Sequence, residues 1–266
     1  GEPLDGRRIL LHAEQGLGDT IQFIRYAPLV AQRGGRVILE VYPQVRPLLD
    51  RLPGIERIVM RGEPLPPFDT HCSLLSLPLV FRTDLDSIPA NVPYLQAREE
   101  SVQAWRRKLG PRSGLRVGIA WSGNPEHRED TRRSIPFPLF RTLLRDDPRV
   151  SFHVVQADIR AEDAEAVAAC GHVHNHARHL TDFGETAALL SLLDIVIGVD
   201  TSVMHLAGAL GVPAWVMLMH VADWRWLLTR DDSPWYPSHE LFRQPRRGDW
   251  ETVIETVSGR LQDMLG

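Results

Sequence analysis

Three short loops hold most of the side chains that could do chemistry in this chain of 266 residues, and each follows an apolar run. The first loop has the sequence QGLGDT over residues 15–20. Its glycines, Gly16 and Gly18, let a ligand approach the backbone and allow positive φ. The helical pattern that follows offers free N–H groups, which favour an anion such as phosphate. The G-x-G-x-x-G spacing of dinucleotide-binding loops is absent.

Asp19 gives this loop a negative charge, which would repel a phosphate. Two interpretations therefore stay open. Asp19 or Thr20 could cap the following helix, as short polar side chains commonly do. Asp19 could instead be a functional carboxylate, and the two roles can coexist.

The second loop, SGNP at residues 122–125, is followed by three arginines and a serine: Arg128, Arg132, Arg133 and Ser134. Arginine binds phosphate through paired hydrogen bonds, so this loop could hold a diphosphate. The alternative is a solvated charged loop, because nearby carboxylates neutralise the arginines. The candidate ligand-binding residues are Ser122, Gly123, Asn124, Arg133 and, at the end of the next apolar run, Gln156.

The third loop begins at Asp200, which ends an apolar run, and continues into the helical pattern TSVMHLAGAL over 201–210. Hydroxyl and N–H groups at Thr201 and Ser202 suit a diphosphate or a ribose. His205 lies on the face of Thr201 because of the i,i+4 spacing. Ser202 and His205 share one turn, which gives poor geometry for a nucleophile and its base. The structural alternative is a helix cap with a core histidine.

Two further groups of residues are less informative. His172, His174 and His176 alternate as on one face of a surface strand, but they lack cysteine or carboxylate partners of usual spacing, so no metal site is expected. The aromatic segments 224–226 and 235–237 could stack a base or a sugar. We expect them instead to fill a seam between two halves of the molecule.

The elements that must position these loops follow a repeating pattern. Apolar runs of strand length alternate with helical patterns, first from residue 8 to 60 and again from 115 to 219. This β-α-β order predicts parallel sheets with right-handed crossovers. Glycine and proline break the chain at 110–114, which predicts domains at residues 1–110 and 111–266. Ligands bind outside the carboxyl ends of parallel strands, so two facing domains would gather the loops around one ligand.

Composition narrows the class of protein. Lys+Arg number 30 against 34 Asp+Glu, a net charge of −4, so a nucleic-acid partner is not expected. No run of 18 apolar residues occurs, so no membrane span is expected. Two cysteines favour a reducing, cytoplasmic location. The abrupt start without methionine suggests a piece of a longer chain.

Three runs resemble the glycosyltransferase family 9 superfamily, whose best-known members are the bacterial heptosyltransferases: AEQGLGDTIQFIRYAPLV, VGIAWSGNP followed by RRSIP, and LLDIVIGVDTSVMHLAGALGVPAW. The resemblance covers nearly the whole chain. It is greatest to the C-terminal regions of bacterial tetratricopeptide-repeat proteins, which implies helical repeats ahead of this region. A more distant similarity is to repeat-linked O-linked N-acetylglucosamine transferases.

The resemblance implies a GT-B architecture, with two facing Rossmann-like domains and a C-terminal helix that often crosses back. It implies an inverting, metal-independent transfer without a cofactor, in which Asp19 matches the proposed base. The residues that match the family's donor site are Asp200, Thr201, Ser202 and His205. Arg133 stands where heptosyltransferases usually carry lysine, and Ser202 where they usually carry glycine, so the donor sugar stays open.

The expected function is therefore transfer of a sugar from a nucleoside-diphosphate sugar to an acceptor that could be a protein, a glycan or a lipid-linked sugar. Two alternatives remain. The chain could be a non-catalytic module that binds a nucleotide sugar or a partner beside helical repeats. It could also be a nucleotide-sugar epimerase, which shares the two-domain layout.

Overall fold

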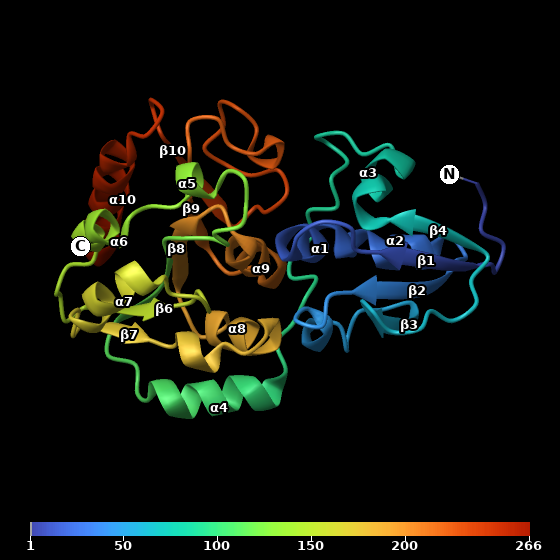
Figure 1. Cartoon of the computed structure of the whole chain (residues 1–266), viewed down its shortest axis with the longest axis horizontal. Coiled ribbons are helices and arrows are strands. Elements are labelled where there is room, and N and C mark those ends of the chain that lie inside the picture. The colour runs from blue at the N-terminus through green and yellow to red at the C-terminus, as the bar shows by residue number, and fades with distance from the viewer. Residues whose placement is uncertain (1) are drawn as a thin grey trace.

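The computed structural model describes residues 2–266 and contains two parallel β-sheets, each flanked by helices (Figure 1). The first sheet has the strand order β3-β2-β1-β4. Its strands are β1 (Arg8–His12), β2 (Arg36–Val41), β3 (Ile55–Met60) and β4 (Thr70–Ser73). We call residues 2–110 the first half and residues 111–266 the second half.

The second sheet has six strands in the order β10-β9-β8-β5-β6-β7. They are β5 (Leu115–Ala120), β6 (Val150–Val154), β7 (Val173–Asn175), β8 (Ile195–Val199), β9 (Ala214–Leu218) and β10 (His239–Arg243). Every strand pairing in both sheets is parallel, which confirms the predicted α/β fold class. The strands β4 and β10 were not predicted, because most of their residues are polar and give little apolar signal.

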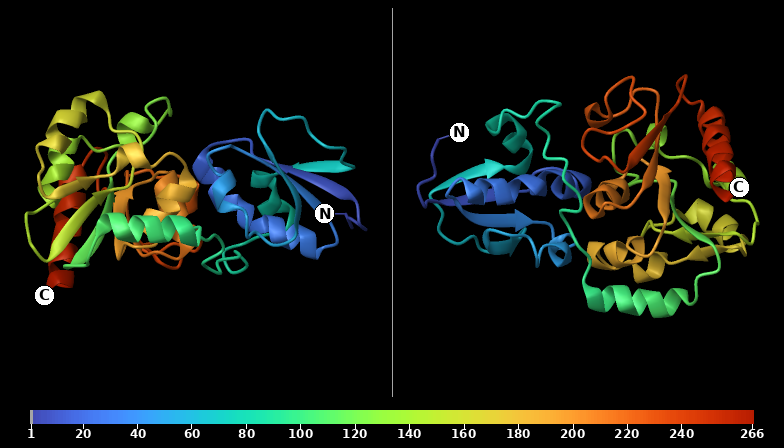
Figure 2. Two further views of the ribbon diagram at one scale, coloured as in Figure 1. Left: turned by 90° about the horizontal axis from the view of Figure 1, so that it is seen from below. Right: turned by 180° about the vertical axis from the view of Figure 1, so that it is seen from behind.

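The helices cover both sheets (Figure 2). They are α1 (Leu17–Phe23), α2 (Ala27–Gln32), α3 (Leu77–Val80), α4 (Glu99–Leu109), α5 (Asp130–Arg133), α6 (Phe137–Phe140), α7 (Ala161–Ala168), α8 (Phe183–Leu190), α9 (Ser202–Leu210) and α10 (Trp250–Leu265). Short 3-10 turns separate several of them, among them Ile24–Tyr26 and Trp224–Trp226. None of the helices within residues 2–266 combines the length and the apolar character needed to cross a membrane.

The helix predicted after the first loop is broken in two. A 3-10 turn over Ile24–Tyr26 separates α1 from α2, and Pro28 lies in the first turn of α2. Proline has no N–H to donate to the carbonyl of Ile24, so the α-helical ladder is interrupted there. The break leaves α1 as a short helix whose first turn carries Asp19.

Two helices lie at unexpected places relative to the halves. Helix α4 precedes residue 110 but packs on α8 of the second half, where Trp105 Nε1 donates to Glu185 Oε2 at 2.9 Å. The boundary between residues 110 and 111 remains a prediction. Helix α10 packs beside β10 on the outer side of the second sheet, far from the first half (Figure 1).

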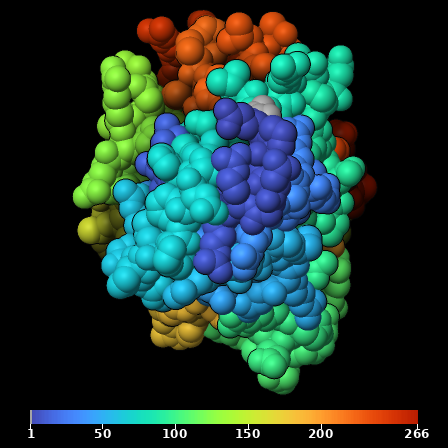
Figure 3. All heavy atoms as spheres, turned by 90° about the vertical axis from the view of Figure 1, so that its right-hand side faces the viewer, coloured from blue at the N-terminus to red at the C-terminus, as the bar shows by residue number. Residues whose placement is uncertain are grey.

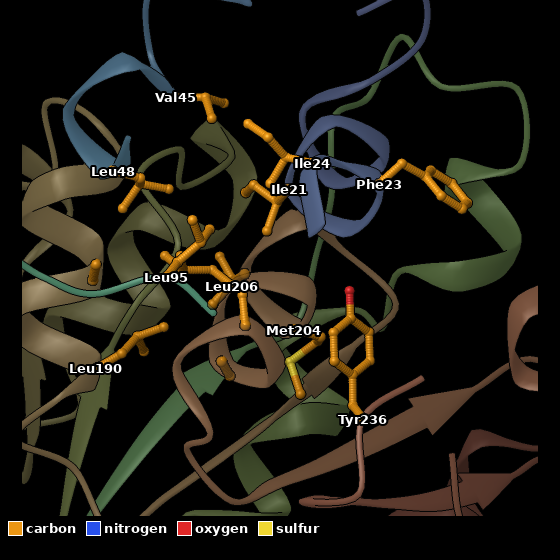
Figure 4. Packing of buried hydrophobic residues seen from close by; sticks show 14 of the residues in the cluster. Ile21, Phe23, Ile24, Val45, Leu48, Leu95, Leu190, Met204, Leu206 and Tyr236 are labelled. Carbon is orange, nitrogen blue, oxygen red and sulfur yellow. The ribbon is translucent and has the colours of Figure 1, made fainter. Parts of the chain in front are cut away.

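The two halves share one hydrophobic core. A single buried cluster includes Ile21 and Ile24 of the first half together with Met204, Leu206 and Tyr236 of the second (Figure 4). Seen from the end of the first half, atoms of the second half project around the rim (Figure 3). We call the contact of residues 15–25 with residues 200–206 and 223–236 the seam. Apolar side chains pack across much of the seam, and this packing fixes the relative position of the two halves.

Gly208 offers a test of how tightly α9 packs against Tyr236 within the second half. A Cβ at Gly208 would overlap the buried ring of Tyr236, 2.5 Å from Cγ. Gly208→Ala should therefore lower the free energy of unfolding by about 1–3 kcal/mol, as overpacking does. Gly259 on α10 is the matched control, because a Cβ added there would have no atom within 4 Å. Gly259→Ala should raise stability by about 0.5–1 kcal/mol in urea denaturation. Equal effects at both positions would contradict the tight packing of α9 against Tyr236.

Candidate functional site

The first turns of α1 and α9 meet across the seam. A Cβ on Gly18 would lie 2.8 Å from His205 Cδ2 and 3.4 Å from the Cα of Ser202. Only glycine allows the two helices to approach this closely. Neither glycine of the first loop uses the positive φ that glycine allows, since Gly16 has φ −70° and Gly18 is not among the positive-φ residues. The absence of a side chain at Gly18 therefore lets α1 and α9 approach each other, and no unusual backbone conformation is involved.

Asp19 has both of the roles that the sequence left open. It is the third residue of α1, and its Oδ2 accepts the N–H of Gly16 at 2.9 Å, which caps the helix. Its Oδ1 forms an ion pair with Arg225 of the second half. The carboxylate is therefore fixed between its own helix and the opposite half.

Arg225 is a site residue that the sequence did not single out. Its exposed fraction is 7%. Besides Asp19, its Nε donates to Gln22 Oε1 at 2.6 Å and an Nη donates to Asp223 Oδ1 at 2.7 Å. The only signal in the sequence is a lone arginine between two tryptophans, in a segment assigned to the seam. That assignment is confirmed for Trp226 and Trp235, which are buried there.

The second loop is held by hydrogen bonds among its own candidates. Gln156 Oε1 accepts the N–H of Trp121 at 2.8 Å, and Gln156 Nε2 donates to Ser122 Oγ at 3.0 Å. Asn124 Oδ1 accepts the N–H of Glu126 at 3.0 Å. Gln156, Ser122 and Asn124 therefore shape the loop through these atoms.

Arg133 connects the second loop to the third. One Nη donates to the carbonyl oxygen of Asp200 at 3.2 Å, and Nε lies 3.6 Å from Asp130 Oδ1. A Cβ on Gly123 would lie 2.8 Å from Arg133 Cζ, so this glycine makes room for the guanidinium. Arg128, by contrast, has a side chain that is 94% exposed and fits the solvated-loop alternative.

The third loop brings an acid and a histidine together in a buried setting. His205 Nδ1 lies 3.0 Å from the hydroxyl of Tyr236, and Nε2 lies 3.8 Å from Asp200 Oδ1. Burial raises the pKa of Asp200 to about 6 and lowers the pKa of His205 well below 6.5. His205 is therefore neutral at pH 7, and its ring stacks on Trp226 at 5.5 Å. The contact of His205 with Tyr236 gives no support to a serine nucleophile at Ser202.

Four buried polar atoms near the seam have no hydrogen-bond partner among the described residues. They are Thr201 Oγ1, Arg133 Nε, Trp226 Nε1 and Gln22 Nε2. Buried polar groups are nearly always paired in proteins, so unpaired donors need an explanation. Each of these atoms can donate a hydrogen bond, and a ligand rich in oxygen acceptors would satisfy them.

The histidines of the second half have another role. His153 Nδ1 and His176 Nε2 lie 3.1 Å apart, and the ring of His176 packs edge-on against Trp105 of α4 at 5.2 Å. Burial lowers the pKa of His153 to about 3 and that of His176 to about 4. No cluster of three or more potential ligands suited to a metal ion occurs in residues 2–266. His176 is thus a buried packing residue and not part of a surface strand.

The raised pKa of Asp200 predicts a pH-dependent stability difference. An acid with a higher pKa in the folded state destabilises the fold once the pH exceeds its unfolded pKa of about 3.9, and the full cost is present above about pH 6. The Asp200 side chain is 20% exposed. Asp200→Asn should therefore stabilise the protein at pH 7.5 by up to about 3 kcal/mol. The difference should vanish below about pH 4 in urea titrations. A stability gain that is independent of pH would contradict the buried-charge explanation.

Comparisons with known proteins agree with this layout. Residues 139–216 match the family model of glycosyltransferase family 9 (heptosyltransferase). Protein FlbA of Caulobacter vibrioides is 29% identical over 99% of this chain. The chain spans about half, 48%, of the length of that curated relative.

Solved structures share the fold at low sequence identity. The E. coli ADP-heptose LPS heptosyltransferase II has a TM-score of 0.64 and 14% identity, covering 97% of this chain and 99% of its own. A family 9 glycosyl transferase from Veillonella parvula has a TM-score of 0.64 and 12% identity, with 91% and 87% coverage. The iron-containing dodecameric glycosyltransferase TibC of E. coli also reaches 0.64, with 13% identity and 100% and 78% coverage. The matched segment and the shared two-sheet fold together support the resemblance of this chain to glycosyltransferase family 9, the heptosyltransferase family.

Proposed function

We propose that this chain transfers a sugar from a nucleoside-diphosphate sugar to an acceptor, with inversion and without a metal ion. The observation that carries the proposal is the meeting of the first turn of α1, which carries Asp19, with the start of α9 beside buried donors that make no hydrogen bond. An inverting transfer needs a base at the acceptor hydroxyl and positive charge at the leaving diphosphate. The first half would supply the base, and the second half would supply the positive charge.

The second half has the chemistry of a diphosphate site. The start of α9 offers backbone N–H groups and the positive end of a helix dipole. The hydroxyl of Thr201 is buried without a hydrogen-bond partner, and Nε of Arg133 makes no hydrogen bond although it is ion-paired with Asp130 at 3.6 Å, so both could donate to phosphate oxygens. Ser202 and Gly123 would line this site, and neutral His205 would add no positive charge to it. These donors would stabilise the leaving group in place of a metal.

The first half would supply the base. The Asp19 carboxylate would accept the proton of the acceptor hydroxyl as that oxygen attacks the sugar. Gly16 holds the carboxylate through its N–H, and Gly18 lets α1 approach α9. The family's named donor in E. coli heptosyltransferase II is an ADP-heptose, so ADP-sugars are the first donors to test.

Several finer points belong to the same proposal and rest on the resemblance. They are a cytoplasmic location, helical repeats in the longer protein, and an acceptor that is a protein, a glycan or a lipid-linked sugar. A non-catalytic module would bind the donor and leave it intact. An epimerase would change the sugar's configuration in the absence of any acceptor.

Loss of the base should slow transfer. Asp19→Asn should lower the transfer rate about 100- to 10,000-fold, because general-base catalysis contributes that much. The donor dissociation constant should not rise. The measurement is release of nucleoside diphosphate in the presence of acceptor. Asp50→Asn is the matched control, because Asp50 is an acid of the first half paired with Arg46 and Arg98 on the surface. Unchanged turnover in Asp19→Asn would remove Asp19 as the base.

Donor binding should depend on Arg133 and not on Arg128. A donor at 100 times its dissociation constant stabilises the protein by about 2.7 kcal/mol, which a thermal-shift panel of ADP- and UDP-sugars detects. Arg133→Ala should abolish most of this shift, since a charge-assisted hydrogen bond is lost. Arg128→Ala, at a side chain 94% exposed, should keep it. Equal shifts in the two variants would place the diphosphate elsewhere.

A further inference from the structure

Arg225 forms an ion pair that joins the two halves. Among residues 2–266, its pairing with Asp19 is the only ion pair between the first half and the second. A buried guanidinium has five N–H donors, and the fork can serve two acceptors at once. Here the acceptors are Asp19, Asp223 and Gln22.

Arg225 lies at the edge of the proposed donor site. The next residue, Trp226, stacks on His205 at 5.5 Å, and its Nε1 is one of the buried donors without a partner. Gln22, which accepts from Arg225 Nε, has an unpartnered Nε2 and is fully buried. The charges of Arg225 and Arg133 both act on Asp200. Arg133 donates to the Asp200 carbonyl oxygen at 3.2 Å, and Arg225 precedes Trp226, whose ring stacks on His205, so both arginines lie near the third loop.

The segment that carries Arg225 is mostly exposed or half-buried. Arg225 is the only buried residue of 219–225, whereas Val221 and Trp224 are 53% and 57% exposed. Leu227 has φ +55°, a conformation that side chains other than glycine rarely adopt. Arg243 donates to the carbonyl oxygens of Trp226 and Leu227 at 3.1 and 3.0 Å, which anchors the far side of the turn. Arg243 thus holds one end of the segment, while the other is held by Arg225, by two hydrogen bonds between His220 and Gln244, and by the stacking of Trp224 on Phe23.

We infer that Arg225 is a second diphosphate-binding residue, which exchanges its Asp19 partner for the donor diphosphate. This inference rests on the proposed function. A diphosphate offers more acceptor oxygens than a carboxylate and carries more charge, so it competes well for the guanidinium. The exchange would release Asp19 Oδ1 for the acceptor hydroxyl at the moment when the donor is in place. Arg225 would then couple donor binding in one half to base availability in the other.

The exchange predicts a specific thermodynamic coupling between Asp19 and Arg225. Titration calorimetry with ADP and UDP as probes gives the dissociation constants of wild type, Arg225→Ala, Asp19→Asn and the double variant. Arg225→Ala should weaken diphosphate binding about 10- to 100-fold. Asp19→Asn should tighten it about tenfold, because Arg225 no longer has to leave a carboxylate. In the Arg225→Ala background, Asp19→Asn should change affinity little.

Controls separate this coupling from general effects. Adenosine and uridine lack phosphate, so their affinities should not respond to either substitution. Arg230→Ala removes an exposed ion pair with Asp232 further along the same segment and should leave diphosphate binding unchanged. Arg225→Lys keeps the charge and should recover part of the affinity if Arg225→Ala folds poorly, which circular dichroism melting reveals.

The outcomes distinguish the inference from the proposed function. Failure of the wild type to bind any nucleoside diphosphate overturns both. Diphosphate binding that is weakened by Arg133→Ala, with no coupling between Asp19 and Arg225, overturns the exchange alone. If Asp19→Asn tightens diphosphate binding equally with and without Arg225, the effect is only the loss of charge repulsion between Asp19 and the diphosphate. That result also overturns the exchange.

Discussion

The close approach of α1 to α9 governs how the two halves of the molecule fit together. Gly18 permits it, because any side chain at that position would overlap the ring of His205. The approach lets Ile21 and Ile24 join the same core as Met204 and Leu206. Burial of these apolar side chains stabilises the contact, but the hydrophobic effect has no preferred direction. The polar groups around them therefore fix the geometry of the contact.

Two arginines of the seam show how that geometry is fixed. Arg25 is buried and makes no ion pair in the described chain, yet its guanidinium lies 4.4 Å from the centre of the Tyr94 ring and donates to the Trp235 carbonyl oxygen at 2.8 Å. Arg225 instead binds the Asp19 carboxylate. A buried cation demands complete pairing, so both residues favour one arrangement of the halves over others. Arg25 does this with groups that have no role in the proposed chemistry, whereas Arg225 uses the proposed base.

Two features on the donor side of the seam lower the stability of the folded protein. Asp200 is an acid whose pKa burial raises to about 6, and the hydroxyl of Thr201 is buried without a partner. Neither feature helps the chain to fold. Features of this kind are common at functional sites, where groups are arranged for a ligand rather than for one another. They lie beside the start of α9, which is where the proposed diphosphate would bind.

The two parallel sheets and the three loops could be predicted from the sequence, because strand and helix periodicity and glycine after an apolar run are local signals. The sequence also indicated that residues 15–20 and 200–205 belong near each other, through the rule that ligand loops gather at the carboxyl ends of parallel strands. Other features became visible only in the folded chain: Gly18 contacts His205 directly, Gln156 holds the second loop, and Arg225 reaches Asp19 from 206 positions away. Contacts between distant segments depend on how the two halves pack, and the spacing of residues along the sequence does not predict that packing.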